Sequence, residues 1–209
     1  MKKSVVLFLI LIIVKTSVAQ LSVGAAFGRF SVPGATSDLK GFAPTLRVEY
    51  TGGEETQQIF LDATLFTKSF PGYETEIVDE YGYLLGFAQT KESYSIKHFQ
   101  LGFKRSLAGD FTDSKFNCFL GAGLAASFVG TKYKYSLTGH SIPDEKINRS
   151  IFGFHFNTGG QWRIKNNIVF ELKGNFDIVL KPMEVRGGDN VSYIVTSLRA
   201  GIMIPIVKY

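Results

Sequence analysis

The sequence of 209 residues holds only one cysteine, one tryptophan and three histidines. A single cysteine, Cys118, cannot form an intramolecular disulfide, so the fold must be stabilised in another way. Beyond Gln20 no apolar run reaches the roughly 18 residues that a membrane-spanning helix needs. No convincing amphipathic helix pattern is present either. These absences argue against a disulfide-stapled domain and against a helical membrane protein.

The sequence also lacks any long block of basic residues, although its formal net charge is +5. Lys2, Lys3 and Lys15 supply three of these charges, so the charge of the chain from residue 20 onward falls to +2. Nucleic-acid binding normally needs a clustered basic surface. We therefore expect no nucleic-acid partner.

The N-terminal segment has the layout of a secretory signal peptide. Two lysines precede an apolar run over residues 5–14, and small residues at Ser17 and Ala19 form a cleavage motif before Gln20. The alternative is a membrane anchor helix, but the run is about half the ~20 residues that such a helix needs. We predict a signal peptide at 1–19 and one domain at 20–209.

Aromatic residues and glycines are abundant, with 19 Phe and 22 Gly, and apolar residues recur at every second position. This period is typical of β-strands. Eight stretches have the pattern, namely 21–31, 42–50, 59–68, 95–105, 116–128, 150–167, 168–180 and 193–206. Each is about as long as the 9–11 residues that a tilted strand needs to cross a bilayer.

The connections between these stretches alternate in length. The connections 32–41, 69–93, 130–149 and 181–192 are long, whereas 51–58, 106–115 and 165–167 are mostly shorter. Long loops at one end and short turns at the other are typical of outer-membrane barrels.

The stretch 150–167 raises the question of which face of the strands meets water. One face carries Phe152, Phe154, Phe156 and Trp162, and the other carries His155, Asn157, Gln161 and Arg163. In a soluble lipocalin-like barrel the apolar face would line a ligand cavity, and in an outer-membrane barrel it would meet lipid. Alternation alone does not separate these two interpretations.

The composition of the polar faces favours the membrane interpretation. They are rich in glycine, which suits the narrow interior of an eight-stranded barrel better than a solvated strand surface. Their charges nearly balance, as expected for salt bridges in a confined lumen. The predicted inward cations and carboxylates are Arg47, Lys104, Arg163, Lys173 and Arg199 against Glu49, Asp62, Glu171 and Asp177.

The end of the chain gives a further indication. Arg199, Gly201, Ile204, Ile206 and the terminal Tyr209 are similar to the C-terminal signal by which the outer-membrane assembly machinery recognises barrels. Pro205 interrupts this pattern and would be tolerated at a strand end or a bulge.

Together these features resemble the small outer-membrane β-barrel domain families, the PorT-like and OmpX-like eight-stranded barrels. The resemblance implies an all-β fold, an eight-stranded antiparallel up-and-down transmembrane β-barrel in the outer membrane of a Gram-negative bacterium. It also implies outer-membrane lipids and the barrel assembly machinery as partners.

Catalysis is not expected. Some eight-stranded barrels modify lipid A, but His98, His140 and His155 are scattered, with neither a Ser-His-Asp pattern nor metal-ligand spacing. We therefore predict no catalytic, cofactor-binding or metal-binding residue. General diffusion through a pore is not expected either, because side chains fill an eight-stranded barrel.

The loop at residues 71–87 is the strongest candidate for binding. It places Glu74, Glu76, Asp79 and Glu80 among tyrosines and leucines. This combination suits a protein partner or a cation. The alternative is a solvated hairpin extension of the strands. We therefore expect a structural or binding role through the long extracellular loops. The competing expectations are a secreted lipocalin-like carrier of an apolar ligand and a lipid A-modifying enzyme.

Overall fold

The structure is a computed structural model that describes residues 20–33, 39–52, 55–78, 80–138, 142–165, 168–185 and 190–208. The predicted signal peptide at 1–19 and His140 lie outside these residues. The strands are β1 (Gln20–Val32), β2 (Leu39–Thr51), β3 (Gln57–Val78), β4 (Leu84–Ala108), β5 (Phe116–Ser136), β6 (Glu145–Lys165), β7 (Ile168–Val185) and β8 (Asn190–Lys208).

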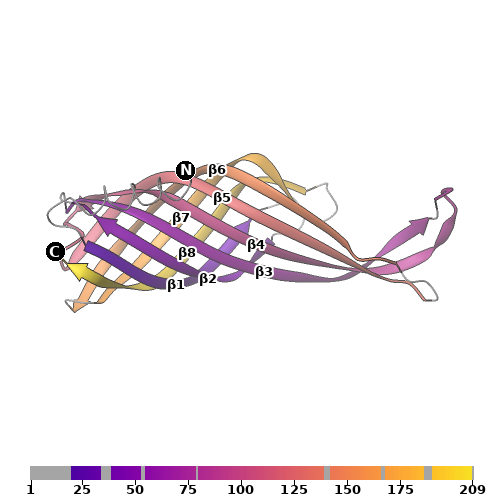
Figure 1. The fold of residues 1–209 in the computed structure, drawn as a ribbon, viewed down its shortest axis with the longest axis horizontal. Coiled ribbons are helices and arrows are strands. Elements are labelled where there is room, and N and C mark those ends of the chain that lie inside the picture. Colours follow the sequence, from indigo (N-terminus) through magenta and orange to yellow (C-terminus); the bar gives the residue numbers. More distant parts are fainter. Residues whose placement is uncertain are drawn as a thin grey trace, which may run out of the picture.

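The strands form one closed antiparallel barrel in chain order (Figure 1). The ring closes where β1 pairs with β8, from Gln20 opposite Lys208 to Ser31 opposite Thr196. The register shifts where Leu21 pairs with Val207 and Ser22 pairs with Pro205. The predicted tolerance of Pro205 is thus explained by a bulge, where a missing backbone donor is harmless. The predicted eight-stranded up-and-down barrel is confirmed.

The strands differ greatly in length. β4 has 25 residues, more than twice the roughly 9–11 that a tilted strand needs to cross a bilayer. β3 to β6 continue far beyond the barrel at one end, which we call the distal end (Figure 1). The first residue of β1 and the last residue of β8 lie at the opposite end. Most of the predicted loop at 69–93 is therefore strand, so this segment is a hairpin extension of β3 and β4.

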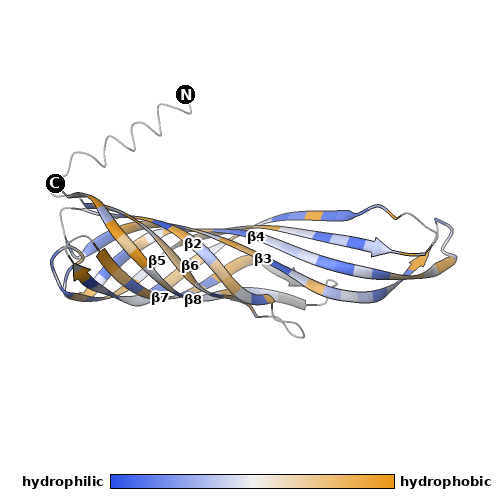
Figure 2. Cartoon of the chain, turned by 90° about the horizontal axis from the view of Figure 1, so that it is seen from below, coloured by the Kyte–Doolittle hydropathy of each residue, from blue (hydrophilic) through white to orange (hydrophobic). Residues whose placement is uncertain are grey.

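The two faces of the strands have the predicted orientation. The large apolar side chains of the barrel wall are exposed, such as Leu124 at 60% and Phe154 at 51%. Their neighbours in sequence are buried in the lumen. Phe152, Phe156 and Trp162 also face outward, whereas His155, Asn157 and Gln161 face inward. Figure 2 shows apolar residues concentrated on the barrel and polar residues on the distal extension.

No helix in the described part of the chain is long and apolar enough to cross a membrane.

The distal part of the lumen holds an apolar cluster. Its rings and aliphatic side chains come from all the strands and pack inside the wall, as in the pair Phe30 and Phe66, whose ring centroids are 5.0 Å apart. The members of this distal apolar cluster are Phe30, Val32, Leu39, Ala43, Phe66, Phe70, Tyr94, Ile96, Val129, Ile151, Val179 and Val195. The sequence pattern did not reveal it, because these residues share faces with polar residues.

Candidate functional site

The middle of the barrel is filled by a network of charged side chains. Asp62 on β3 is fully buried and accepts hydrogen bonds from Arg47 Nε at 2.8 Å, Arg47 Nη2 at 3.2 Å and Lys173 Nζ at 2.8 Å. Arg199 Nη1 lies 3.4 Å from the same carboxylate. Three cations from three strands therefore share one carboxylate.

A second carboxylate, Glu171, extends this network. It pairs with Arg47, accepts a hydrogen bond from Lys104 Nζ at 3.0 Å and accepts another from Gln161 Nε2 at 2.7 Å. Lys104 also pairs with Glu49. Arg47, Lys104, Glu171 and Asp62 thus each have at least two partners, which favours the burial of charges in a closed lumen.

One predicted member of the network lies elsewhere. Arg163 is at the end of β6, where its Nη2 donates a hydrogen bond to the carbonyl oxygen of Phe111 at 3.0 Å. It is only half-buried. This contact places Arg163 beside the turn between β4 and β5, a depth along the barrel axis that the inward-facing pattern alone does not give.

A histidine cluster lies beside the charge network. His98 Nε2 donates to Asp177 Oδ2 at 2.9 Å, and Ser127 Oγ is 2.7 Å from His98 Nδ1. His155 binds the other oxygen of Asp177, and Asn157 Nδ2 donates to His155 Nε2 at 2.9 Å. The fold thus brings together serine, histidine and aspartate, which sequence reasoning missed because the residues lie on three separate strands.

This constellation has the residue types of a nucleophile, a base and an acid. However, Ser127, His98 and Asp177 are at most 1% exposed, and the ring of Phe30 packs against His98 at 5.7 Å. A substrate therefore cannot reach Ser127 in this conformation. The cluster supports a structural role, in which hydrogen bonds tie β4, β5, β6 and β7 together across the lumen.

Aromatic rings also pack against the charge network. Lys104 Nζ lies 4.5 Å from the ring centroid of Phe119, and Lys173 Nζ lies 4.0 Å from that of Phe60. Phe111 in the turn between β4 and β5 packs on Phe119. Because the ring of Phe60 also packs on His155 at 5.5 Å, apolar rings contact both the charges and the histidines.

The predicted glycines of the inner face make room for these side chains. A Cβ atom at Gly123 would lie 2.2 Å from the carbonyl oxygen of Leu101, and one at Gly28 would lie 2.0 Å from that of Leu198. Neither position tolerates a side chain without a backbone shift. At these two positions the neighbouring strand requires glycine. The expected shortage of room inside the barrel is seen at Gly102 and Gly159, where a Cβ atom would lie 2.7 Å from the Phe60 ring and 2.8 Å from the Phe119 ring.

The distal extension presents the surface that the sequence singled out. The end of the β3–β4 hairpin turns through Gly82, whose φ is +85°, a value that favours glycine. Tyr81 and Tyr83 are 78% and 72% exposed, and Leu84 and Phe87 follow on β4 at more than half exposed. Among the described residues no group of three His, Cys, Asp or Glu side chains is placed to hold a metal ion.

Comparison with known proteins gives the fold but no family. No family model and no curated protein sequence matches the chain. A major outer membrane protein from Thermus thermophilus is 14% identical, with a TM-score of 0.59, over 90% of this chain and 99% of that one. Ail of Yersinia pestis, solved with the heparin analogue sucrose octasulfate, is 12% identical, with a TM-score of 0.53, over 91% and 99%.

Neisserial surface protein A is 14% identical, with a TM-score of 0.51, over 89% of this chain and 97% of that one. The Thermus thermophilus structure is an outer membrane protein, and the predicted localisation in the outer membrane agrees with this fold. The chain therefore has the fold of the small eight-stranded outer-membrane β-barrels. The narrower PorT-like assignment stays a prediction.

Proposed function

We propose that this protein is an integral outer-membrane barrel that holds a rigid β-hairpin outside the cell to bind a protein partner. In this proposal residues 1–19 direct export, and the C-terminal strand is recognised by the barrel assembly machinery. The distal end then faces the outside of the cell. The described short turns, the start of β1 and the end of β8 lie at the opposite end, as in outer-membrane barrels generally.

The observation that carries the binding role is the exposed apolar tip of the hairpin. Six large apolar side chains of this tip, which are Val78, Tyr81, Tyr83, Leu84, Leu85 and Phe87, are at least 45% exposed. Several large apolar side chains exposed on one hairpin tip are costly in water, and such a group is typical of an interaction site. Tyrosine is also favoured at protein interfaces.

The hairpin is ordered rather than a loose loop. Its strands pair from Phe70 opposite Glu92 to Val78 opposite Leu84, with register shifts after Phe70 and after Ile77. The hydroxyls of Thr90 and Thr75 are 2.9 Å apart, which adds a side-chain hydrogen bond. A preorganised surface loses less conformational entropy on binding than a flexible one.

The lipocalin-like alternative does not fit this structure. A soluble carrier needs an apolar cavity inside and a polar surface outside. Here the centre of the lumen is filled by paired charges, and the apolar side chains of the wall face outward. The alternative of a lipid A-modifying enzyme has no supporting observation, since Ser127 and His98 are enclosed.

Site-specific photo-crosslinking in intact cells tests the binding role. A benzophenone amino acid is placed at Tyr83 on the tip and, as a matched control, at the exposed Lys91 on the same hairpin. We expect a discrete protein adduct from position 83 that disappears when Leu84→Asp and Phe87→Asp are added, while the folded barrel persists on gels. Equal adducts from both positions, or none from position 83, would contradict the proposal.

A further inference from the structure

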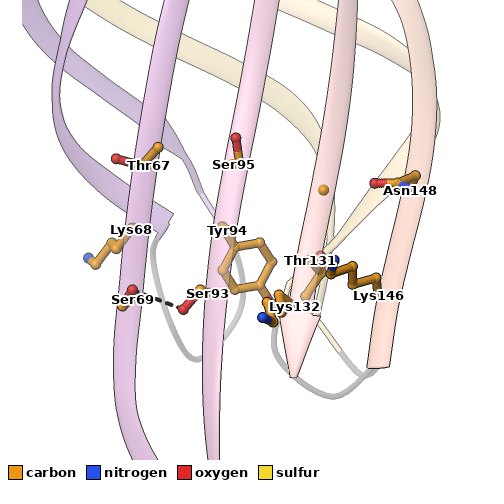
Figure 3. A pocket seen from close by; sticks show the side chains of 11 residues that line it. Thr67, Lys68, Ser69, Ser93, Tyr94, Ser95, Thr131, Lys132, Lys146 and Asn148 are labelled. Carbon is orange, nitrogen blue, oxygen red and sulfur yellow. Dashed lines mark hydrogen bonds between the residues drawn. The ribbon is translucent and has the colours of Figure 1, made fainter. Parts of the chain in front are cut away.

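The outer face of the barrel has a pocket lined by serine, threonine and lysine residues directly beyond its apolar band. A cavity of about 470 Å³ lies over β3 to β6, between Thr67, Ser93 and Lys132 (Figure 3). A second cavity of about 310 Å³ adjoins it and shares Ser95, Gly130 and Asn148. Together they form one depression, which we call the outer pocket.

The strand register fixes the depth of the outer pocket. Leu65, Lys97, Phe128 and Ser150 lie in one row across β3 to β6, and Phe128 lines the smaller cavity. The next distal row is Thr67, Ser95, Gly130 and Asn148. On the side away from the distal end, the row next to Leu65 and Phe128 is apolar, and its Phe99 and Phe152 are exposed. The pocket therefore begins where lipid-facing side chains end, at the depth of the headgroups.

Small hydroxyl-bearing residues form the surface of the pocket. Ser69 Oγ and Ser93 Oγ are 3.0 Å apart and share a hydrogen bond (Figure 3). Gly130 has no side chain, and a Cβ atom there would meet only Asn148 Oδ1 at 3.3 Å and the carbonyl oxygen of Ser95 at 3.8 Å. Hydroxyl groups supply hydrogen-bond donors to an anion, and the small side chains leave space for it.

The pocket carries an excess of positive charge. Lys97, Lys132 and Lys146 line it, together with Lys68 and Arg149. Asp144 is the nearby carboxylate, 2.6 Å from Lys132 Nζ. The hydrogen bond from Lys132 lowers the pKa of Asp144, and the charges of Lys132, Lys134 and Lys146 lower it further. Several lysines thus surround Asp144, and an ion pair this exposed is weak enough for another anion to replace.

We propose that the outer pocket binds the phosphorylated headgroup of an outer-leaflet lipid. Its phosphates would contact Lys97, Lys132 and Lys146, and its acyl chains would follow Leu65, Phe128 and Phe152 down the wall. A lipid fits better than a soluble anion because the pocket is continuous with the apolar band on the same face. The inference rests on the proposed outward direction of the distal end.

Native mass spectrometry of the folded barrel in neutral detergent tests this assignment. The probes are diphosphorylated lipid A, its monophosphorylated form, phosphatidylcholine and the soluble polyanion sucrose octasulfate. The variants are K97Q/K132Q/K146Q and the pocket-filling Gly130→Leu, which leaves every charge in place. The control K40Q/K115Q/K181Q removes the same charge from other exposed positions. A shift in gel mobility on boiling verifies that each variant is folded.

We expect retention of diphosphorylated lipid A to exceed that of the other probes. At about fivefold per lysine near a lipid surface, the pocket triple variant loses on the order of 100-fold in affinity. Gly130→Leu weakens binding as well, and the charge-matched control does not. Equal retention by wild type and both pocket variants would overturn the assignment, as would preferential binding of the soluble polyanion. Folded barrels that bind no lipid leave the hairpin proposal intact, so the two failures are distinguishable.

Discussion

Replacing Asp62 by asparagine is the most incisive change to the interior, because it removes charge while keeping shape. The carboxylate is fully buried and faces Arg47, Lys173 and Arg199. In the variant these cations remain buried with Glu171 and Glu49 as their nearest compensation. Breaking a buried ion pair by removing one partner costs about 3–5 kcal/mol. We expect a loss of this size in the free energy of unfolding.

Equilibrium unfolding in urea with detergent or lipid vesicles measures this loss. The single tryptophan, Trp162, packs on the outer wall against Phe116 at 5.0 Å and reports the exposure of the barrel surface. Glu80→Gln on the exposed tip is the control for removing a negative charge, and it should change stability by less than about 0.5 kcal/mol.

A compensating substitution sharpens this test. Lys173→Met removes one of the cations left without compensation, so D62N/K173M should be more stable than the sum of the single changes by about 0.5–3 kcal/mol. If D62N unfolds within about 0.5 kcal/mol of wild type, or if the two changes are additive, the lumen is hydrated and the network argument is refuted.

Three further outcomes follow from the structure. Gly123→Val should prevent folding, since its Cβ would lie 2.2 Å from a carbonyl oxygen, whereas Gly174→Ala, whose nearest contact is 3.8 Å, should fold and shift on boiling. Asp110 accepts hydrogen bonds from several backbone N–H groups; its partial burial opposes them, but they hold its pKa below the ordinary 3.8. The Asp110 carboxylate therefore stabilises the fold above pH 3.8, and this stabilisation is lost as the pH falls through the lower pKa of the folded state. D110N should cost about 1 kcal/mol of unfolding free energy at pH 7 and progressively less below pH 3.8. Urea titrations at several pH values measure this. Deleting residues 72–87 should spare the heat-shifted barrel and abolish co-purification of the protein that position 83 crosslinks in the full chain; loss of the barrel would show that the hairpin is structural.

The strand pattern predicted most of the barrel. Alternation from Leu46 to Glu49 or from Phe152 to Asn157 assigns each side chain to a face, because a membrane barrel imposes one solvent on each side. The distal extension was harder to predict, since strands beyond the lipid have water on their outer face and lose the apolar alternation. Pro71 and Gly72 in β3 also have the composition of a loop.

The contacts inside the lumen could not be predicted from the sequence. His98, Ser127 and Asp177 meet only because of the register and tilt that close the ring, and these depend on all eight strands. Phe60 and Phe119 are buried on faces that also carry polar residues, so their depth along the axis decides whether they contact charge or apolar neighbours. The outer pocket was missed for the same reason, since its residues come from four strands.

The central claim is that the chain forms a closed barrel in the outer membrane. Electrophoresis of the isolated outer-membrane fraction in SDS, with and without boiling, tests it most directly. We expect the protein in that fraction, with a band that changes mobility on boiling, because a closed β-barrel resists SDS until it is heated. Recovery of the protein only in the soluble periplasm, with no mobility shift, would contradict the claim.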